Sequence, residues 1–117
     1  MKLINRSALV VLPRQPYADW VNGLDIATSG LEAPLTLADH RREGRVYLVS
    51  EQETAAAVTL TLESLRERIL DNELSAWDEF GDHWPPRSPD LFEAWFEVQP
   101  QLLCFDLSSE PLLVATL

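Results

Sequence analysis

The stretch Trp77–Trp84 (WDEFGDHW) holds the residue types closest to those of a catalytic or metal site. On a continuous helix Glu79 and His83 would lie one turn apart, and so would Asp78 and Asp82. A carboxylate and an imidazole on one helix face can share a divalent metal, and a second carboxylate pair could complete the ligand shell. We therefore keep, as an alternative function, a small metal-binding protein or enzyme built on His83 and these three carboxylates.

Gly81 and the pair Pro85-Pro86 argue against that spacing, because they are expected to end the helix inside the stretch. His83 would then lie at a helix C-terminus, where a positive imidazolium suits the helix dipole. The single cysteine, Cys104, lies in an apolar run, where cysteine usually behaves as a small buried hydrophobe. His40 lies in a charged stretch typical of a solvated loop.

No phosphate-binding loop, nucleophile elbow or paired-histidine metal motif occurs in the chain. We therefore name no catalytic residue and expect no cofactor. Whether the protein is an enzyme stays open, but the sequence favours a protein without catalytic activity.

Acidic residues recur every four positions in a predicted long helix, at Glu63, Glu67 and Asp71. Like charges at that spacing oppose helix formation by a few tenths of a kcal/mol per pair. Such a stripe fits a surface kept for a basic partner, and it also fits a merely solvated helix face. Trp84, beside Pro85, is the aromatic residue that we expect nearest the surface, and tryptophan is common at protein contacts. These four residues form the predicted protein-interaction surface.

Composition and charge narrow the class of partner. The 117 residues include 19 acidic and 9 basic side chains, for a net charge of −10. Such a chain repels phosphate backbones and anionic lipid, so we expect no direct nucleic-acid binding and no membrane partner. The length and the 46% hydrophobic content fit a single domain over residues 1–117. Since we find no signal peptide and no apolar run of bilayer length, we expect a cytoplasmic location.

Apolar patterning predicts three strands, separated by helices. The strands are expected at Leu3–Leu12, Arg45–Val49 and Leu102–Leu107, and the first should be central because Ala8–Leu12 is apolar at every position. Helices are expected at Pro16–Gly23, from a Ser50–Glu53 capping box to Gly81, and from Ser88-Pro89 to Phe96, with a single turn at Thr36–Asp39. The run Thr59-Leu60-Thr61 favours strand locally and could bend the long helix.

These elements predict an α+β fold of the order β-α-β-α-α-β. We expect a small mixed sheet of three or four strands, with helices packed on one face. If the first two strands run parallel, their connection should be right-handed. The apolar segment Leu112–Leu117 would add an edge strand or cover the core, and self-association of the chain through it is a further hypothesis.

Three stretches of the chain resemble the corresponding stretches in a group of short acidic bacterial proteins of unknown function. They are Ile4–Val11, Pro16–Trp20 and Phe92–Phe96. The resemblance implies a bacterial, cytoplasmic protein and carries no activity or site residue with it. From the acidic stripe and the nearby tryptophan, we predict a non-catalytic protein-interaction or regulatory module. Its partner would be a basic protein surface or a second copy of the chain.

Overall fold

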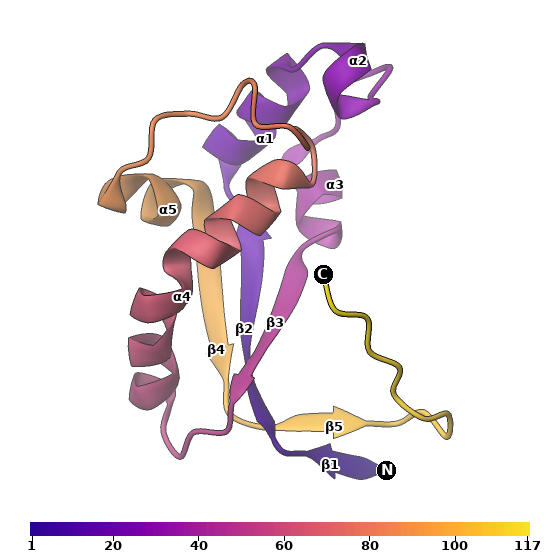
Figure 1. Ribbon diagram of the computed structural model, residues 1–117, viewed down its shortest axis with the longest axis vertical. Helices are drawn as coiled ribbons and strands as arrows, with labels where there is room; N and C mark the ends of the chain where they lie inside the picture. Colours follow the sequence, from indigo (N-terminus) through magenta and orange to yellow (C-terminus); the bar gives the residue numbers. More distant parts are fainter.

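The computed structural model describes all 117 residues and shows an α+β fold (Figure 1). The strands are β1 (Lys2–Ile4), β2 (Arg6–Pro13), β3 (Arg45–Ser50), β4 (Phe96–Gln101) and β5 (Cys104–Asp106). The helices are α1 (Gln15–Gly23), α2 (Ile26–Ser29), α3 (Leu37–Arg42), α4 (Ala55–Ser75) and α5 (Pro89–Trp95). None of these helices is both long enough and apolar enough to cross a bilayer.

The main sheet has the order β3-β2-β4, and β1 pairs with β5 in a separate two-stranded ribbon. The central place predicted for Ala8–Leu12 is confirmed, because β2 pairs with a strand on each side. Along β2 the side chains of Leu9 and Val11 are fully buried on the face that meets α4, whereas Val10 points to the opposite face. Helix α4 thus covers only one of the two faces of this run.

The expected order β-α-β-α-α-β with three or four strands in one sheet is not matched, because the structure has five strands in two sheets. The expected mixed sheet is also wrong, because every strand pair is antiparallel. The connection from β2 to β3 explains the difference. It contains the three short helices α1, α2 and α3, which gather at one end of the sheet (Figure 1). The chain therefore returns to the main sheet at the same end at which it left it, with Arg45 opposite Val11. Because of this, β3 must run antiparallel to β2.

The long helix α4 is shorter at both ends than predicted. Its N-cap is Thr54, whose hydroxyl accepts a hydrogen bond from the Ala57 N–H at 3.1 Å, whereas Ser50 ends β3. A capping box does occur, but in α3, between Thr36 and Asp39.

The threonine run does not break α4. The hydroxyls of Thr59 and Thr61 donate back to the carbonyls of Ala55 and Ala57, at 3.1 and 3.0 Å, so both side chains are satisfied within the helix. Beyond Ser75 the chain turns, so Phe80 leaves the predicted apolar face and is 84% exposed.

The C-terminal third differs most from expectation. Ser88 caps α5 as predicted, with its hydroxyl 3.2 Å from the Leu91 N–H. Phe96, expected in the helix, instead begins β4 opposite Pro13, and the strand predicted at Leu102–Leu107 is reduced to β5. Residues 107–117 form no strand and do not cover the core. Within this segment Leu112 approaches the β1–β5 ribbon and Leu117 approaches β3.

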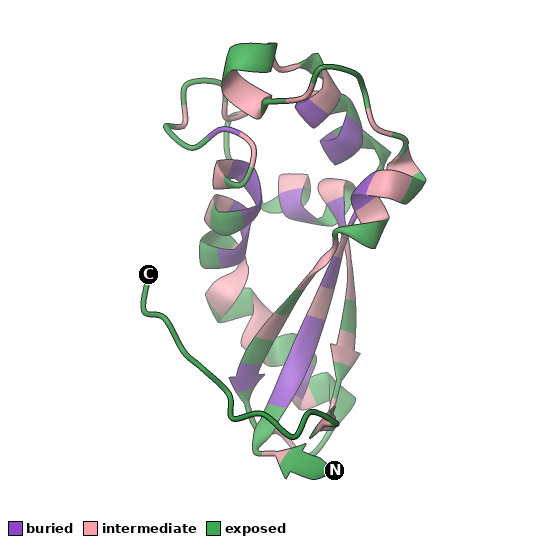
Figure 2. Ribbon diagram, turned by 90° about the vertical axis from the view of Figure 1, so that its right-hand side faces the viewer, coloured by how far each residue is buried: buried purple, intermediate pink, exposed green.

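The core lies between one face of the main sheet and the helices α1, α4 and α5 (Figure 2). Tyr17 of α1, Phe92 of α5 and Phe96 of β4 form its aromatic centre, with ring centroids 4.8 Å apart for Tyr17 and Phe96. On the other face of the sheet Val46 and Leu48 of β3 remain 60% and 53% exposed. One apolar sheet face is therefore covered and the other is open.

Gly44 provides a test of how tightly α3 meets β2. A Cβ atom at Gly44 would lie 2.5 Å from Leu12 Cδ2 and 3.1 Å from the carbonyl oxygens of Arg41 and Val11. We expect Gly44→Ala to lower the free energy of unfolding by about 1–3 kcal/mol in urea titrations, because two of these neighbours are backbone atoms. Gly23→Ala, whose Cβ meets nothing within 4 Å, should be neutral or stabilising. Equal effects of the two substitutions would contradict this packing.

Candidate functional site

The stretch Trp77–Trp84 forms a turn that Asp78 holds together. The buried Asp78 carboxylate accepts the His83 backbone N–H at 2.7 Å, and the Asp78 carbonyl accepts the Trp84 indole N–H at 3.0 Å. Gly81 adopts a φ of 76°, a conformation that glycine tolerates without strain. Asp78 is therefore fully used in fixing this turn.

The structure does not assemble the alternative metal site. Because α4 ends at Ser75, the one-turn spacing of Glu79 with His83 does not exist. The His83 ring lies 3.7 Å from Asp78 Oδ2, but Glu79 and Asp82 do not join them, and nowhere do three His, Cys, Asp or Glu side chains converge on one point. Metal binding by these four residues has no geometric support.

Of the four predicted interaction residues, Glu63 and Glu67 line a groove of about 450 Å³ between α4 and the segment Arg87–Phe92, and both are exposed. Asp71 pairs with Arg87, and the Arg87 guanidinium lies 5.7 Å from the Trp84 ring, so Arg87 links Asp71 to Trp84. Asp71 and Trp84 themselves do not line the groove. Trp84, expected to be the aromatic residue nearest the surface, is half-buried against the core, whereas Phe80 is 84% exposed.

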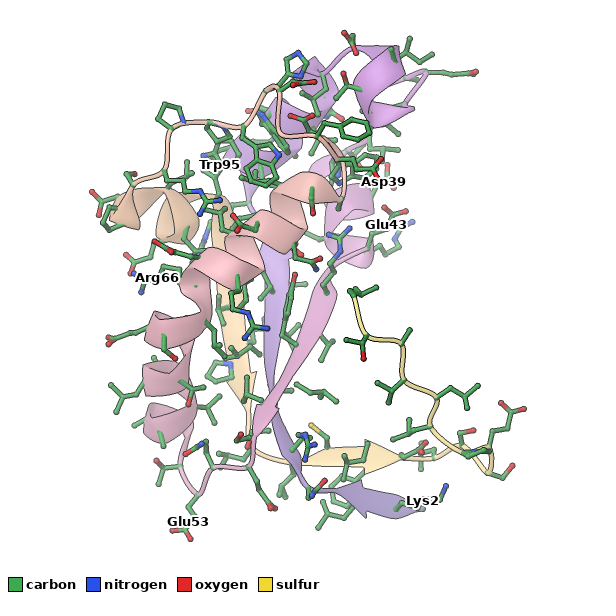
Figure 3. The ribbon with its side chains drawn as sticks, viewed as in Figure 1. Lys2, Asp39, Glu43, Glu53, Arg66 and Trp95 are labelled. Atoms are coloured by element: carbon green, nitrogen blue, oxygen red, sulfur yellow. The ribbon has the colours of Figure 1, made fainter.

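Arginines make this groove a mixed-charge surface. Arg66, labelled in Figure 3, lies 3.9 Å from Glu93 of α5 and 6.0 Å from the Phe92 ring centroid. Arg68 and Arg87 also line the groove. Asp71 and Glu93 are thus neutralised by neighbours, whereas Glu63 and Glu67 form no ion pair. The unpaired negative charge is confined to the two exposed glutamates.

Sequence reasoning missed the most polar cluster of the interior, which centres on Glu73. The Glu73 side chain is fully buried, with Arg45 Nη1 3.2 Å from Oε1 and the Tyr47 hydroxyl donating to Oε2 at 2.5 Å. The Tyr17 hydroxyl donates to the Glu73 carbonyl at 2.6 Å, and Asn72 donates to the Tyr47 oxygen at 2.9 Å. The cluster joins α4 to β3 and to α1. In the sequence, the indication of this cluster is a glutamate that falls on the apolar face of a predicted helix.

Burial dominates the electrostatics of this cluster. It raises the pKa of the Glu73 carboxyl, although the Tyr47 hydrogen bond and the Arg45 charge oppose that rise. Burial likewise raises the pKa of the Tyr17 and Tyr47 hydroxyls. Since every polar atom around the carboxylate has a partner and none of Glu73 is exposed, this cluster is a structural connection closed to any substrate in this conformation.

A large exposed apolar surface is the second feature that the sequence did not predict. We call it the apolar flank. It comprises the open face of β3, the β1–β5 ribbon with its adjoining residues, and the extended tail, and its members are Leu3, Val46, Leu48, Leu103, Phe105, Leu107, Leu112, Leu113, Val114 and Leu117. Each of these side chains is more than half exposed. Of these segments the sequence predicts a contact role for the tail alone, and it gives no sign that Val46 and Leu48 of β3 are exposed.

Removing the counter-charge of Glu73 gives a pH-dependent test. Arg45→Met leaves a buried carboxylate without its cation, so we expect a loss of about 3–5 kcal/mol in unfolding free energy at pH 8. Burial raises the pKa of the Glu73 carboxyl above its ordinary value, so ionisation of this group costs folding free energy as the pH rises. The loss should therefore be smaller at pH 5 than at pH 8, because a lower pH favours the uncharged carboxyl.

Arg42→Met is the matched control, because Arg42 is exposed and pairs only with Asp39 on the surface. Its effect should stay below about 1 kcal/mol at both pH values. Equal, pH-independent losses in the two variants, measured by urea denaturation, would contradict the role assigned to the Arg45–Glu73 pair.

No protein-family model, curated protein or solved structure matches this chain. The resemblance to short acidic bacterial proteins therefore stays a prediction.

Proposed function

We propose that this protein is a non-catalytic protein-interaction module that binds another protein chain through the apolar flank. The observation that carries the proposal is the excess of exposed surface. The accessible surface is 7862 Å². A compact monomer of 117 residues is expected to expose about 6,400 Å². The Cα radius of gyration, 15.6 Å, likewise exceeds the value of about 13 Å typical of a domain of this size.

Much of the exposed apolar surface lies on segments that the tail connects, because Leu112 lines a pocket with Leu3 of the ribbon and Leu117 lines one with Leu48 of β3. The ten side chains of the apolar flank expose on the order of 1,000 Å² together, whereas a soluble monomer rarely shows apolar patches above a few hundred Å². That area is comparable with the roughly 800 Å² that each partner buries in a standard protein–protein interface. We place this module in the cytoplasm, in line with the expectation from the sequence.

Substitutions on the open face of β3 test this proposal. The double variant Val46→Lys/Leu48→Lys should lose partners that a tagged wild-type chain captures from native lysate, because two charges would have to be desolvated on binding. Capture should persist at high salt, as expected of an apolar contact. Leu60→Lys is the control, since Leu60 is 66% exposed on α4, outside the apolar flank. Identical capture by both variants would refute the assignment.

A second candidate function is recognition of a basic protein segment by the groove beside α4. The specific observation in its favour is that Glu63 and Glu67 face this groove without ion pairs. Such a contact would gain from Coulomb attraction at low ionic strength and weaken as salt screens it. Salt dependence therefore separates this groove from the apolar flank.

Charge reversal tests the groove directly. Glu63→Lys/Glu67→Lys should weaken binding of a lysine-rich peptide at least tenfold at low salt, measured by fluorescence anisotropy, because it converts attraction to repulsion. Glu32→Lys/Glu43→Lys makes the same change in net charge at exposed positions away from the groove. Asp71 is left intact, since its pairing with Arg87 holds the groove wall. If both double variants weaken binding equally, only net charge matters and the groove is not a site.

A further inference from the structure

The free edge of β3 is suited to accept another strand. In the order β3-β2-β4, β3 pairs through Arg45–Ser50 with β2 on one side only. β4 forms the other edge, but it contains Pro100, which lacks an N–H, and the charged Glu97. β3 has no proline and no acidic residue. Of the two edges of the main sheet, only β3 is left without the features that block strand addition.

The tail Leu112–Leu117 has the properties of a strand without a partner. Its six residues carry no charge, and β3 is also six residues long. Its backbone makes no hydrogen bond within the chain, and Leu113 and Val114 are 92% and 91% exposed. Short uncharged segments rich in leucine and β-branched residues readily form strands when an edge is offered.

An apolar groove of about 360 Å³ runs between the edge of β3 and α4. Tyr47, Leu48 and Val49 line one side and Leu65 and Ile69 the other. Leu117 of the same chain already lies at this groove, but it remains fully exposed (Figure 1). Within one chain, then, the tail reaches β3 with one end and buries almost nothing there.

The apolar and nearly neutral composition of the flank fits a second copy as the occupant. Two chains of net charge −10 repel each other wherever acidic faces meet, so self-association needs a contact region close to neutral. The apolar flank is such a region, because its one acid among the strands, Asp106, pairs with Lys2 at 3.9 Å, and the tail is uncharged. The flank also offers the area that a stable dimer interface requires.

We propose that the tail Leu112–Leu117 of each copy adds as an edge strand to β3 of a second copy, in a reciprocal two-fold dimer. This inference rests on the proposed function and names its partner. Main-chain hydrogen bonds to β3 would supply register, and alternate tail side chains would enter the groove beside α4. The exchange is isologous, so both free edges and both tails are used at once.

Adjacent proline substitutions test strand addition. In an edge strand only alternate N–H groups face the neighbour. Of Val114→Pro and Ala115→Pro, we therefore expect one to raise the dimer dissociation constant at least tenfold in sedimentation equilibrium and the other to change it much less. Both variants should keep the far-UV circular dichroism of the wild type, because the tail lies outside the core. Equal effects of the two prolines would overturn strand addition.

A mixing experiment distinguishes a second copy from the chain's own tail. In a Cys104→Ser background, one sample carries Leu48→Cys and another carries Val114→Cys, and the two are mixed and treated with a short bismaleimide. We expect a covalent product of dimer mass that contains one chain of each kind. Linkage of the two cysteines within one chain, in a protein carrying both, without any product of dimer mass, would overturn the second-copy assignment.

The outcomes also separate this inference from the proposed function. A wild-type chain that sediments as a monomer at all concentrations overturns the dimer. If Val46→Lys/Leu48→Lys still loses captured partners in that case, the apolar flank binds a different protein and the proposed function stands. If that variant also captures the same partners as the wild-type chain, both the dimer and the proposed function fail.

Discussion

The fold depends on the burial of one face of a three-stranded sheet beneath α4. Leu9 and Val11 of β2 are wholly removed from water there, against Val58, Ile69 and Leu74 of the helix. Apolar burial of this kind is the dominant favourable contribution to folding. A chain of 117 residues that places its one long helix on this face has no comparable element left for the other. The open face of β3 follows directly from that distribution.

Glu73 shows how the helix is held in register on the sheet. A buried carboxylate contributes little net stability, since its desolvation offsets much of the attraction to Arg45. It does, however, disfavour alternative placements of α4, because any rotation would leave the charge buried without Arg45, Tyr47 or both. The groove beside α5 and the groove beside β3 lie on opposite sides of α4. Both grooves therefore depend on the orientation of α4 that Glu73 specifies.

The sequence predicted the elements that rest on local rules. The α+β class, the helix predicted at Pro16–Gly23, the Ser88 cap and the central place of Ala8–Leu12 follow from apolar patterning and capping, which act over a few residues. Strand direction, the split of the last strand and the Glu73 cluster depend on contacts between distant segments and could not be read locally. Of the four predicted surface residues, Glu63 and Glu67 line one groove, but the arginines that also line it depend on the packing of α5 against α4 and could not be predicted from the sequence.

The tail also bears on solubility. An uncharged apolar segment beside a free strand edge has the composition of segments that stack into fibrils. A reciprocal exchange closes on itself, whereas a head-to-tail exchange would leave one edge and one tail available at each end and could grow without limit. The charge of −10 on every copy opposes that growth, because each added chain meets the accumulated repulsion of those before it. In the proposed exchange, high acidity would thus limit assembly to small closed units.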